Sequence, residues 1–389
     1  MNKWKGRLVY TLTVLISVLL IYFGNRVLTD TPWFAEMRDA EKPIRAVVTA
    51  VVDKREETYQ MDEGVMVEQA EIIFHARVLS GEKKGEILTA NQLFDSYTAT
   101  GAKVVEVGDK VMLYPADMSI YNANWVFGEY LRSDGILWLC VVFFALILLF
   151  GRKKGVHTIV SLSLTTLAVF LVFVPSVLVG KNIYLCSILV CVFIIVMTLL
   201  IINGWNKKSF VAVVGCVSGV LVAGLLAAVM DRALRLTGIV DESSVYLQYI
   251  ADGVTIDLRA IIFAGIILGA VGAVMDVAMS LASSLQEVYE VSESPSVHSI
   301  MKSGFNIGRD IMGTMANTLI LAYIGSSLSV VLLLVAYNSS MLALFNKEMI
   351  VVEILQAVAG SIGILCTIPL TSLCAALVYV PRKKEGTDE

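Results

Sequence analysis

The sequence predicts an α-helical multi-pass membrane protein with about eight transmembrane helices and a small extracytoplasmic β-barrel or sandwich inserted after the first helix. Three observations support this fold class. Hydrophobic residues make up 57% of the 389-residue chain and charged residues only 16%, and the mean hydropathy is +0.76. Several apolar runs are close to the ~20 residues that a helix needs to cross a bilayer. A charged segment rich in Val and Thr, at 30–130, separates the first run from the others.

Composition and charge exclude some classes of partner. The formal net charge is −4 and basic residues cluster only briefly beside the apolar runs, so we do not expect nucleic acid binding. All six cysteines lie inside apolar runs without a CxxC pair, which predicts buried hydrophobic side chains instead of disulfides. His75, His157 and His298 are too scattered to predict a metal site, and we expect no cofactor. The lipid bilayer is the one partner that composition predicts.

Residues 1–29 are predicted to form a signal-anchor transmembrane helix. The apolar run at 8–23 follows Lys3, Lys5 and Arg7, which is the charge pattern of a signal peptide or a signal anchor. No A-x-A cleavage site follows the run, so we expect the helix to stay uncleaved.

Residues 30–130 are predicted to form a β-rich domain. Short β-branched runs are separated by turn signals such as 80–85 and 107–109, and the segment EIIFHARVLS alternates apolar and polar residues. This spacing predicts a small barrel or sandwich. We expect a spacer or docking module, to which a protein partner could bind, and keep ligand binding as the alternative.

The remaining apolar runs predict a seven-helix bundle over residues 131–381. They lie at 135–151, 157–180, 182–202, 209–230, 257–281, 307–335 and 350–380. Lys and Arg cluster at 152–154, 207–208 and 382–384, and such clusters mark cytoplasmic loops. Both termini are therefore expected in the cytoplasm, with residues 382–389 as a short tail. The β-rich domain is then extracytoplasmic, on a cell membrane.

Polar and small residues form stripes on two consecutive bundle helices. Spacings of three and four place such residues on one face of a helix. The run at 257–281 carries Gly265, Gly269, Gly272, Asp276 and Ser280, and the run at 307–335 carries Arg309, Asp310, Gly313, Thr314 and Asn317. We interpret the glycines as a groove and the polar residues as candidate ligands of a substrate or ion.

Asp276, Arg309 and Asp310 are the charged members of these stripes. Each costs roughly 2.5–3.5 kcal/mol inside a bilayer, so each needs a partner or a water-filled cavity. All three are expected near the cytoplasmic side, where Arg309 could pair with either carboxylate. The alternative is that Arg309 and Asp310 reach the lipid headgroups, with Asp276 as a satisfied structural residue.

The run at 350–380 carries a third stripe of polar and small residues. Its members are Glu353, Gln356, Gly360, Gly363, Thr367 and Thr371. Close helix packing explains a Gly and Thr stripe as well as a pathway does. Glu353 and Gln356 favour a polar cleft that opens to the outside. At the start of the run at 257–281, Asp257 and Arg259 could form an external gate with Glu353.

Two long segments resemble the YibE/F family of bacterial membrane proteins. They are DGVTIDLRAIIFAGIILGAVGAVMDVAMSLASSLQEV and SGFNIGRDIMGTMANTLILAYIGSSL, and the segments VLSGEKKGE and VGDKVMLY of the β-rich domain are also similar to that family. The resemblance covers nearly the whole chain and implies a multi-pass protein of bacterial origin. It implies no chemistry.

The polar stripes favour a secondary transporter or exporter of a small solute, coupled to protons or cations through the intramembrane carboxylates. The sequence has no ATP-binding P-loop. One alternative is a membrane scaffold or sensor whose external β-domain binds a protein. The other is an intramembrane aspartyl hydrolase, although the sequence around Asp310 is IGRD and not the GxGD of such enzymes. We therefore expect no enzyme activity. A polar pathway that reaches inward would distinguish a transporter from a scaffold.

Overall fold

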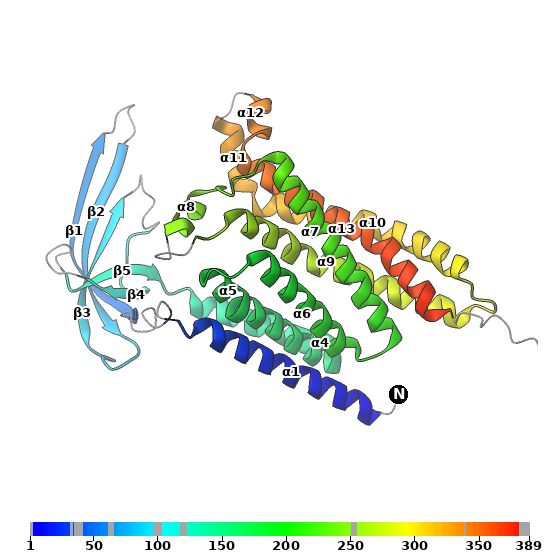
Figure 1. Cartoon of the computed structure of the whole chain (residues 1–389). Coiled ribbons are helices and arrows are strands. Elements are labelled where there is room, and N and C mark those ends of the chain that lie inside the picture. The colour runs from blue at the N-terminus through cyan, green and yellow to red at the C-terminus, as the bar shows by residue number, and fades with distance from the viewer. Residues whose placement is uncertain are drawn as a thin grey trace, which may run out of the picture. The chain divides into compact units, whose positions relative to one another are not determined.

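The computed structural model describes residues 3–31, 34, 42–60, 66–95, 103–116, 123–249, 255–337 and 340–380 (Figure 1). The chain divides into two compact units, one of residues 31–146 and one of residues 1–30 with 147–389. Each unit is described by itself. The expected cytoplasmic tail at 382–389 lies outside the described residues.

The unit of residues 31–146 contains a closed five-stranded β-barrel. Its strand order is β1-β2-β3-β5-β4, in which β3 and β5 pair in parallel and all other neighbours are antiparallel. The strands are β1 (Ile44–Gln60), β2 (Met66–Val78), β3 (Ile87–Asp95), β4 (Lys110–Pro115) and β5 (Trp125–Tyr130). The expected β-rich domain is therefore a barrel and not a sandwich.

The alternating pattern of β2 supplies the barrel core. Ile72, Phe74 and Ala76 are fully buried, while Ile73 and His75 between them are partly exposed. Successive side chains of a strand point to opposite faces, so this alternation follows from the sequence.

Gln92 is a fully buried polar side chain of β3. Its Nε2 donates to the carbonyl of Lys103 and its Oε1 accepts from the backbone N–H of Val105, both at 2.9 Å. In Gln92→Leu, the Lys103 carbonyl still accepts a hydrogen bond from the Tyr130 hydroxyl at 2.8 Å. The buried N–H of Val105, however, loses the Gln92 oxygen to which it donates. We expect the barrel's free energy of unfolding to fall by about 1–3 kcal/mol.

Pulse proteolysis of the full-length protein in increasing urea measures this loss. Lys84→Gln, in the exposed turn before β3, is the control and should leave the urea concentration at the unfolding midpoint unchanged. Equal midpoints for Gln92→Leu and the unmodified protein would contradict the prediction.

Long apolar helices form the other unit, and residues 133–146 of one helix belong to the unit of the barrel. Among the described residues, six helical stretches are long and apolar enough to cross a membrane, and a bent pair of helices makes up to seven. The six are α1 (Lys3–Thr29), α4 (Ser133–Ala168) continued by the π-turn η1 (Val169–Phe173) and α5 (Val174–Leu178), α6 (Ile183–Asn203), α7 (Lys207–Leu234), α9 (Leu258–Val291) and α13 (Glu348–Tyr379). The bent pair is α10 (Val297–Ser326) and α11 (Leu328–Tyr337), and α8 (Glu242–Tyr249) and α12 (Met341–Phe345) are short.

The expected spans at 135–151 and 157–180 form one helical stretch of 46 residues. This stretch is broken at Arg152, whose backbone has φ 48° and ψ −125°. A methyl group on Gly155 would overlap the carbonyl oxygen of Ile147. In a straight helix these two residues would be about 12 Å apart along the axis. The chain therefore turns back at Arg152.

The expected single span at 307–335 is also different in the structure. The axes of α10 and α11 are bent by 63° at Ser327. Gly325, Ser326 and Ser327 stand at the bend, and the Ser326 hydroxyl donates to the carbonyl of Tyr323 at 2.8 Å. Gly and Ser pairs are common at helix kinks, because a hydroxyl can satisfy a carbonyl that the helix frees.

The bundle core lies where α13 packs against α7, α9 and α10. Ile195 of α6, Ile266 and Leu281 of α9 and Ile364 of α13 are fully buried there. The core therefore places α9, α10 and α13, which carry the three polar stripes, next to one another.

Candidate functional site

The stripe of α13 is largely buried against α7. A methyl group on Gly219 of α7 would overlap the Thr367 hydroxyl and lie 3.0 Å from the carbonyl oxygen of Gly363. A methyl group on Gly363 would lie 2.9 Å from the Cβ of Ala223. The Thr367 hydroxyl donates to the Gly363 carbonyl at 2.8 Å within its own helix. These residues form a packing seam, which leaves no room for a solute.

The stripes of α9 and α10 are exposed. We call them together the polar face. On α9, Val274, Val277 and Ala278 are buried, whereas the stripe is exposed on the opposite side. The exposed residues are Gly265, Gly269, Gly272, Asp276 and Ser280 of α9 and Arg309, Asp310, Gly313, Thr314 and Asn317 of α10. Among the described residues, nothing lies within 4 Å of a methyl group added at Gly272 or Gly313, apart from their own chain neighbours and helix backbone.

The expected network of Asp276, Arg309 and Asp310 has no ion pair within 4.0 Å among the described residues. The two helices contact each other on both sides of these residues. A methyl group on Gly269 would overlap the Tyr323 hydroxyl, and one on Gly304 would lie 3.3 Å from Leu285. Asp276 lies between these two contacts along α9, and Arg309 and Asp310 lie between them along α10.

Tyr323 of α10 lies where the three striped helices meet. Its hydroxyl reaches Gly269 of α9, where a larger residue would exclude it. Close by, Gln356 of α13 lies 3.7 Å from the position of a Cβ on Gly265, and Leu319 of α10 lies 2.9 Å from that on Gly360. The sequence analysis did not select Tyr323. The sequence places it four residues after Leu319 on one face of the helix, but only the structure shows that this face is toward α13.

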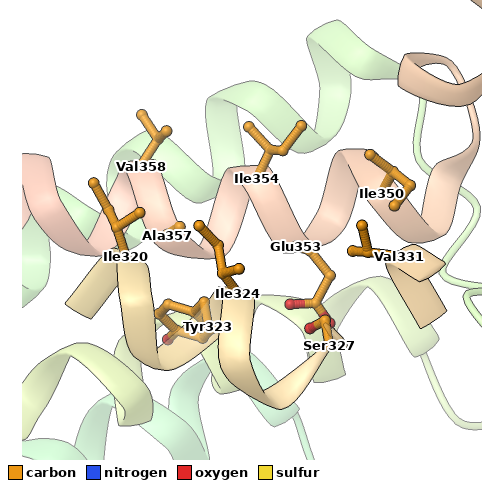
Figure 2. A pocket seen from close by; sticks show the side chains of 10 residues that line it. All are labelled: Ile320, Tyr323, Ile324, Ser327, Val331, Ile350, Glu353, Ile354, Ala357 and Val358. Atoms are coloured by element: carbon orange, nitrogen blue, oxygen red, sulfur yellow. The ribbon is translucent and has the colours of Figure 1, made fainter. Parts of the chain in front are cut away.

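Beside Tyr323, a cavity of ≈ 210 Å³ opens between α10, α11 and α13 (Figure 2). We call it the Glu353 pocket. Glu353 and Ser327 are lining residues with polar side chains, and Tyr323 contributes its ring, because its hydroxyl lies against Gly269. The wall itself is almost entirely apolar. Its apolar lining includes Ile320, Ile324, Val331, Ile350, Ile354 and Val358. Glu353 and Tyr323 thus belong to one cavity, in which the carboxylate has apolar neighbours.

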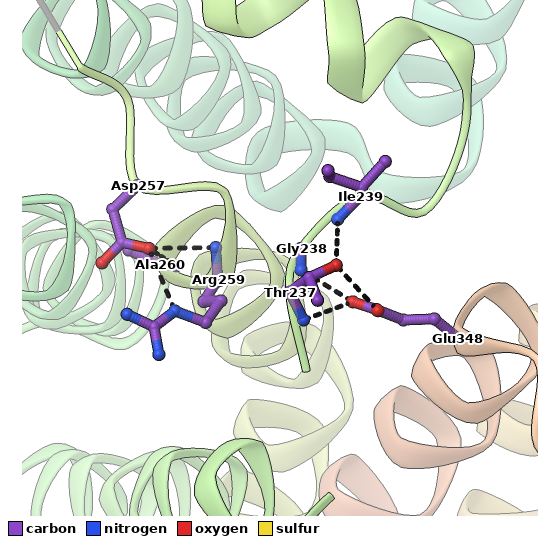
Figure 3. A network of polar contacts seen from close by, with 7 residues as sticks. All are labelled: Thr237, Gly238, Ile239, Asp257, Arg259, Ala260 and Glu348. Atoms are coloured by element: carbon purple, nitrogen blue, oxygen red, sulfur yellow. Dashed lines mark hydrogen bonds and ion pairs between the residues drawn. The ribbon is translucent and has the colours of Figure 1, made fainter. Parts of the chain in front are cut away.

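The expected gate residues have other roles in the structure. Asp257 caps the start of α9, where Oδ1 accepts from the backbone N–H groups of Arg259 and Ala260 at 3.1 and 3.4 Å (Figure 3). The Nε of Arg259 lies 3.7 Å from the same oxygen. Among the described residues, neither side chain forms an ion pair with Glu353. The pair therefore stabilises the first turn of α9.

Glu348, at the start of α13, holds the loop between α7 and α8 (Figure 3). Its carboxylate accepts from the N–H groups of Thr237 and Gly238 at 2.8 and 2.7 Å and from the Thr237 hydroxyl at 2.8 Å. Gly238 has φ +88°, and a methyl group there would lie 2.5 Å from the Cβ of Leu258. We call this arrangement the Glu348 clamp. It joins α13, the loop and the start of α9.

Among the described residues, no group of three or more His, Cys, Asp or Glu side chains is placed to hold a metal ion. The exposed Asp276 and the partly buried Glu353 are single carboxylates on different helices. Each can accept a proton or face one cationic group.

Comparison with protein-family models finds a match, which covers the helical part of the chain. The family model described as YibE/F-like protein matches residues 139–381, which is more than half of the chain. No curated protein and no solved structure matches it. The chain therefore belongs to the YibE/F-like family.

Proposed function

We propose that this protein is a secondary transporter or exporter of a small solute in the bacterial cell membrane. The solute moves along the polar face of α9 and α10. Asp276 couples this movement to a proton or cation, because an exposed carboxylate without an ion pair can take up either.

The observation that carries this proposal is the difference between the stripes. The stripe of α13 is largely buried in the packing seam, whereas the stripes of α9 and α10 are exposed although the same kinds of residue form them. An exposed charge or amide in hydrocarbon is costly, at roughly 2.5–3.5 kcal/mol for a charge. The polar face therefore borders water in a membrane, and α9 and α10 line a hydrated path.

Tyr323 is suited to be the gate of this path. Its ring lines the Glu353 pocket and its hydroxyl lies against Gly269 of the polar face. It therefore separates the pocket from the part of the face that carries Asp276. A change of its rotamer would join the two, as alternating access requires.

The topology that we propose has eight spans. If straight, the 46-residue stretch would be about 69 Å long, more than twice the ~30 Å hydrocarbon core. Its break at Arg152 makes two spans, and the bent pair α10 and α11 makes one more. The basic residues at 152–154 and 207–208 then lie in the cytoplasm with both termini. The barrel and the Glu348 clamp lie outside.

Cysteine accessibility tests the hydrated path. In a background without the six native cysteines, Asn317→Cys and Thr314→Cys should react with a small charged methanethiosulfonate at least 10-fold faster than Leu365→Cys. Leu365 of α13 is exposed but apolar, so it faces lipid in this proposal, where a thiol does not ionise. Ala359→Cys is the buried control. If Asn317→Cys and Thr314→Cys react as slowly as Leu365→Cys, no hydrated path exists and the transporter proposal is wrong.

A scaffold or sensor is the second candidate, and the surface of the barrel favours it. Val52 of β1 and Ile87 and Leu93 of β3 are 55%, 60% and 51% exposed. A partner protein that covered these side chains would remove their apolar surface from water. In this case the polar face would pack against a protein, and all four cysteine variants would be inert.

A further inference from the structure

We propose that the Glu353 pocket binds a small organic cation with an apolar body, and that its ammonium group contacts the Glu353 carboxylate. This inference rests on the proposed transporter function and gives its substrate class. The pocket, the carboxylate and the aromatic ring beside it carry the argument.

The carboxylate requires a positive partner. Glu353 is on the second turn of α13, a candidate membrane span, and is only partly exposed. Among the described residues, no Lys, Arg or His lies within 4.0 Å of it. None of the described residues that line the pocket is basic (Figure 2). A carboxylate in such surroundings attracts a cation and repels an anion.

The lining selects the rest of the ligand. Isoleucine and valine side chains from α10, α11 and α13 cover most of the wall, so an apolar body replaces lipid or water there at little cost. The ring of Tyr323 adds an aromatic face, which attracts an ammonium group. The volume of ≈ 210 Å³ is below the roughly 300–1,000 Å³ of sites for drug-sized molecules, which limits the ligand to a small solute.

The donor set excludes a bare metal ion as the preferred ligand. Ca²⁺ takes six to eight oxygen ligands and Mg²⁺ an octahedral shell. The lining residues that can offer a polar side chain are Glu353, with one carboxylate, and Ser327, with one hydroxyl, since the Tyr323 hydroxyl lies against Gly269. Such a set leaves a divalent cation short of ligands, whereas an ammonium group needs only one carboxylate and a few neighbours.

Binding of radiolabelled tetraethylammonium and benzylammonium to the full-length protein in lipid nanodiscs tests the inference. We expect saturable binding of at least one of them. Benzyl alcohol, a neutral analogue of benzylammonium, should not displace the bound cation. Glu353→Gln should weaken binding at least 10-fold. Tyr323→Phe keeps the ring and should retain most of the affinity, whereas Tyr323→Leu should lose it.

Glu290→Gln is the matched control, because Glu290 is an exposed carboxylate on α9 whose neighbour Gln286 donates to it at 2.7 Å. It should bind both cations like the unmodified protein. The inference is overturned if neither cation binds saturably, or if Glu353→Gln binds with unchanged affinity. Thermal unfolding of each variant shows that a loss of binding is not a loss of fold.

The two proposals can fail separately. If the cations bind but Asn317→Cys stays inert, the pocket is a cation site of a protein that is not a transporter. If Asn317→Cys reacts but no cation binds, the path stands and the substrate class is wrong.

Discussion

Gly219→Ala should lower the free energy of unfolding of the helical bundle by about 1–3 kcal/mol, although alanine is the better helix former. The new methyl group would overlap the Thr367 hydroxyl and lie 3.0 Å from both the Gly363 carbonyl and Val274. A hydroxyl can rotate away, but the Gly363 carbonyl is helix backbone, so α7 and α13 must separate. Among the described helix pairs, α13 packs most extensively against α7, so the loss spreads along the whole packing seam. Gly219→Leu should yield no folded protein.

Two native cysteines can report the unfolding of the bundle. Cys191 and Cys216 are fully buried in the bundle and react with a fluorescent maleimide only after unfolding. The matched control is Gly272→Ala, because a methyl group at Gly272 meets nothing within 4 Å beyond its own helix. It should be neutral or stabilising by up to about 1 kcal/mol. If Gly219→Ala and Gly272→Ala gave the same melting temperature, the seam would not determine bundle stability.

Glu348→Ala should open the loop between α7 and α8 and cost about 2–3 kcal/mol. The carboxylate accepts three hydrogen bonds, of which two come from the backbone N–H groups of Thr237 and Gly238. Hydrogen bonds to a charged acceptor are about twice as strong as neutral ones. After truncation the two N–H groups have only water as a partner, and the loop loses its link to α13.

Hydrogen exchange at residues 237–239, measured by mass spectrometry on the full-length protein, follows this opening. We expect exchange to become 10- to 100-fold faster, which corresponds to about 1.4–2.8 kcal/mol. Glu290→Ala, which removes a single exposed hydrogen bond on α9, should change neither the loop nor the stability by more than ~0.5 kcal/mol. Unchanged exchange in Glu348→Ala would show that the contact of Gly238 with α9 is sufficient to hold the loop.

The helices and strands could be predicted because their signals are local. The alternation around Ile72 and Phe74 marks a strand whatever surrounds it, and the length of an apolar run marks a helix that can span a bilayer. The breaks were harder to place. The basic cluster at 152–154 was visible in the sequence, but Gly325, Ser326 and Ser327 did not by themselves mark a bend, because small residues also occur in straight helices.

The candidate residues show the limit of periodicity. Gly272 and Gly363 lie in similar stripes, yet Gly363 is buried against Ala223, whereas no described residue outside its own helix comes within 4 Å of a methyl group at Gly272. A stripe of small and polar residues lets another helix approach closely and also lets water enter. Periodicity shows which residues share a face of a helix but not what that face contacts. It therefore could not distinguish the packing seam of α13 from the polar face of α9 and α10.

The sequence by itself determined the long apolar helices, the β-rich domain after the first of them, the helical stripes and the resemblance to the YibE/F family. Composition and period are sufficient for the first three, since each is a property of a short segment. Only the tertiary structure decided that the β-rich domain is a closed barrel, that Glu348 holds Thr237, and that Tyr323 lies against Gly269. These contacts join residues distant in sequence, and their register depends on how the helices pack, which no local pattern specifies.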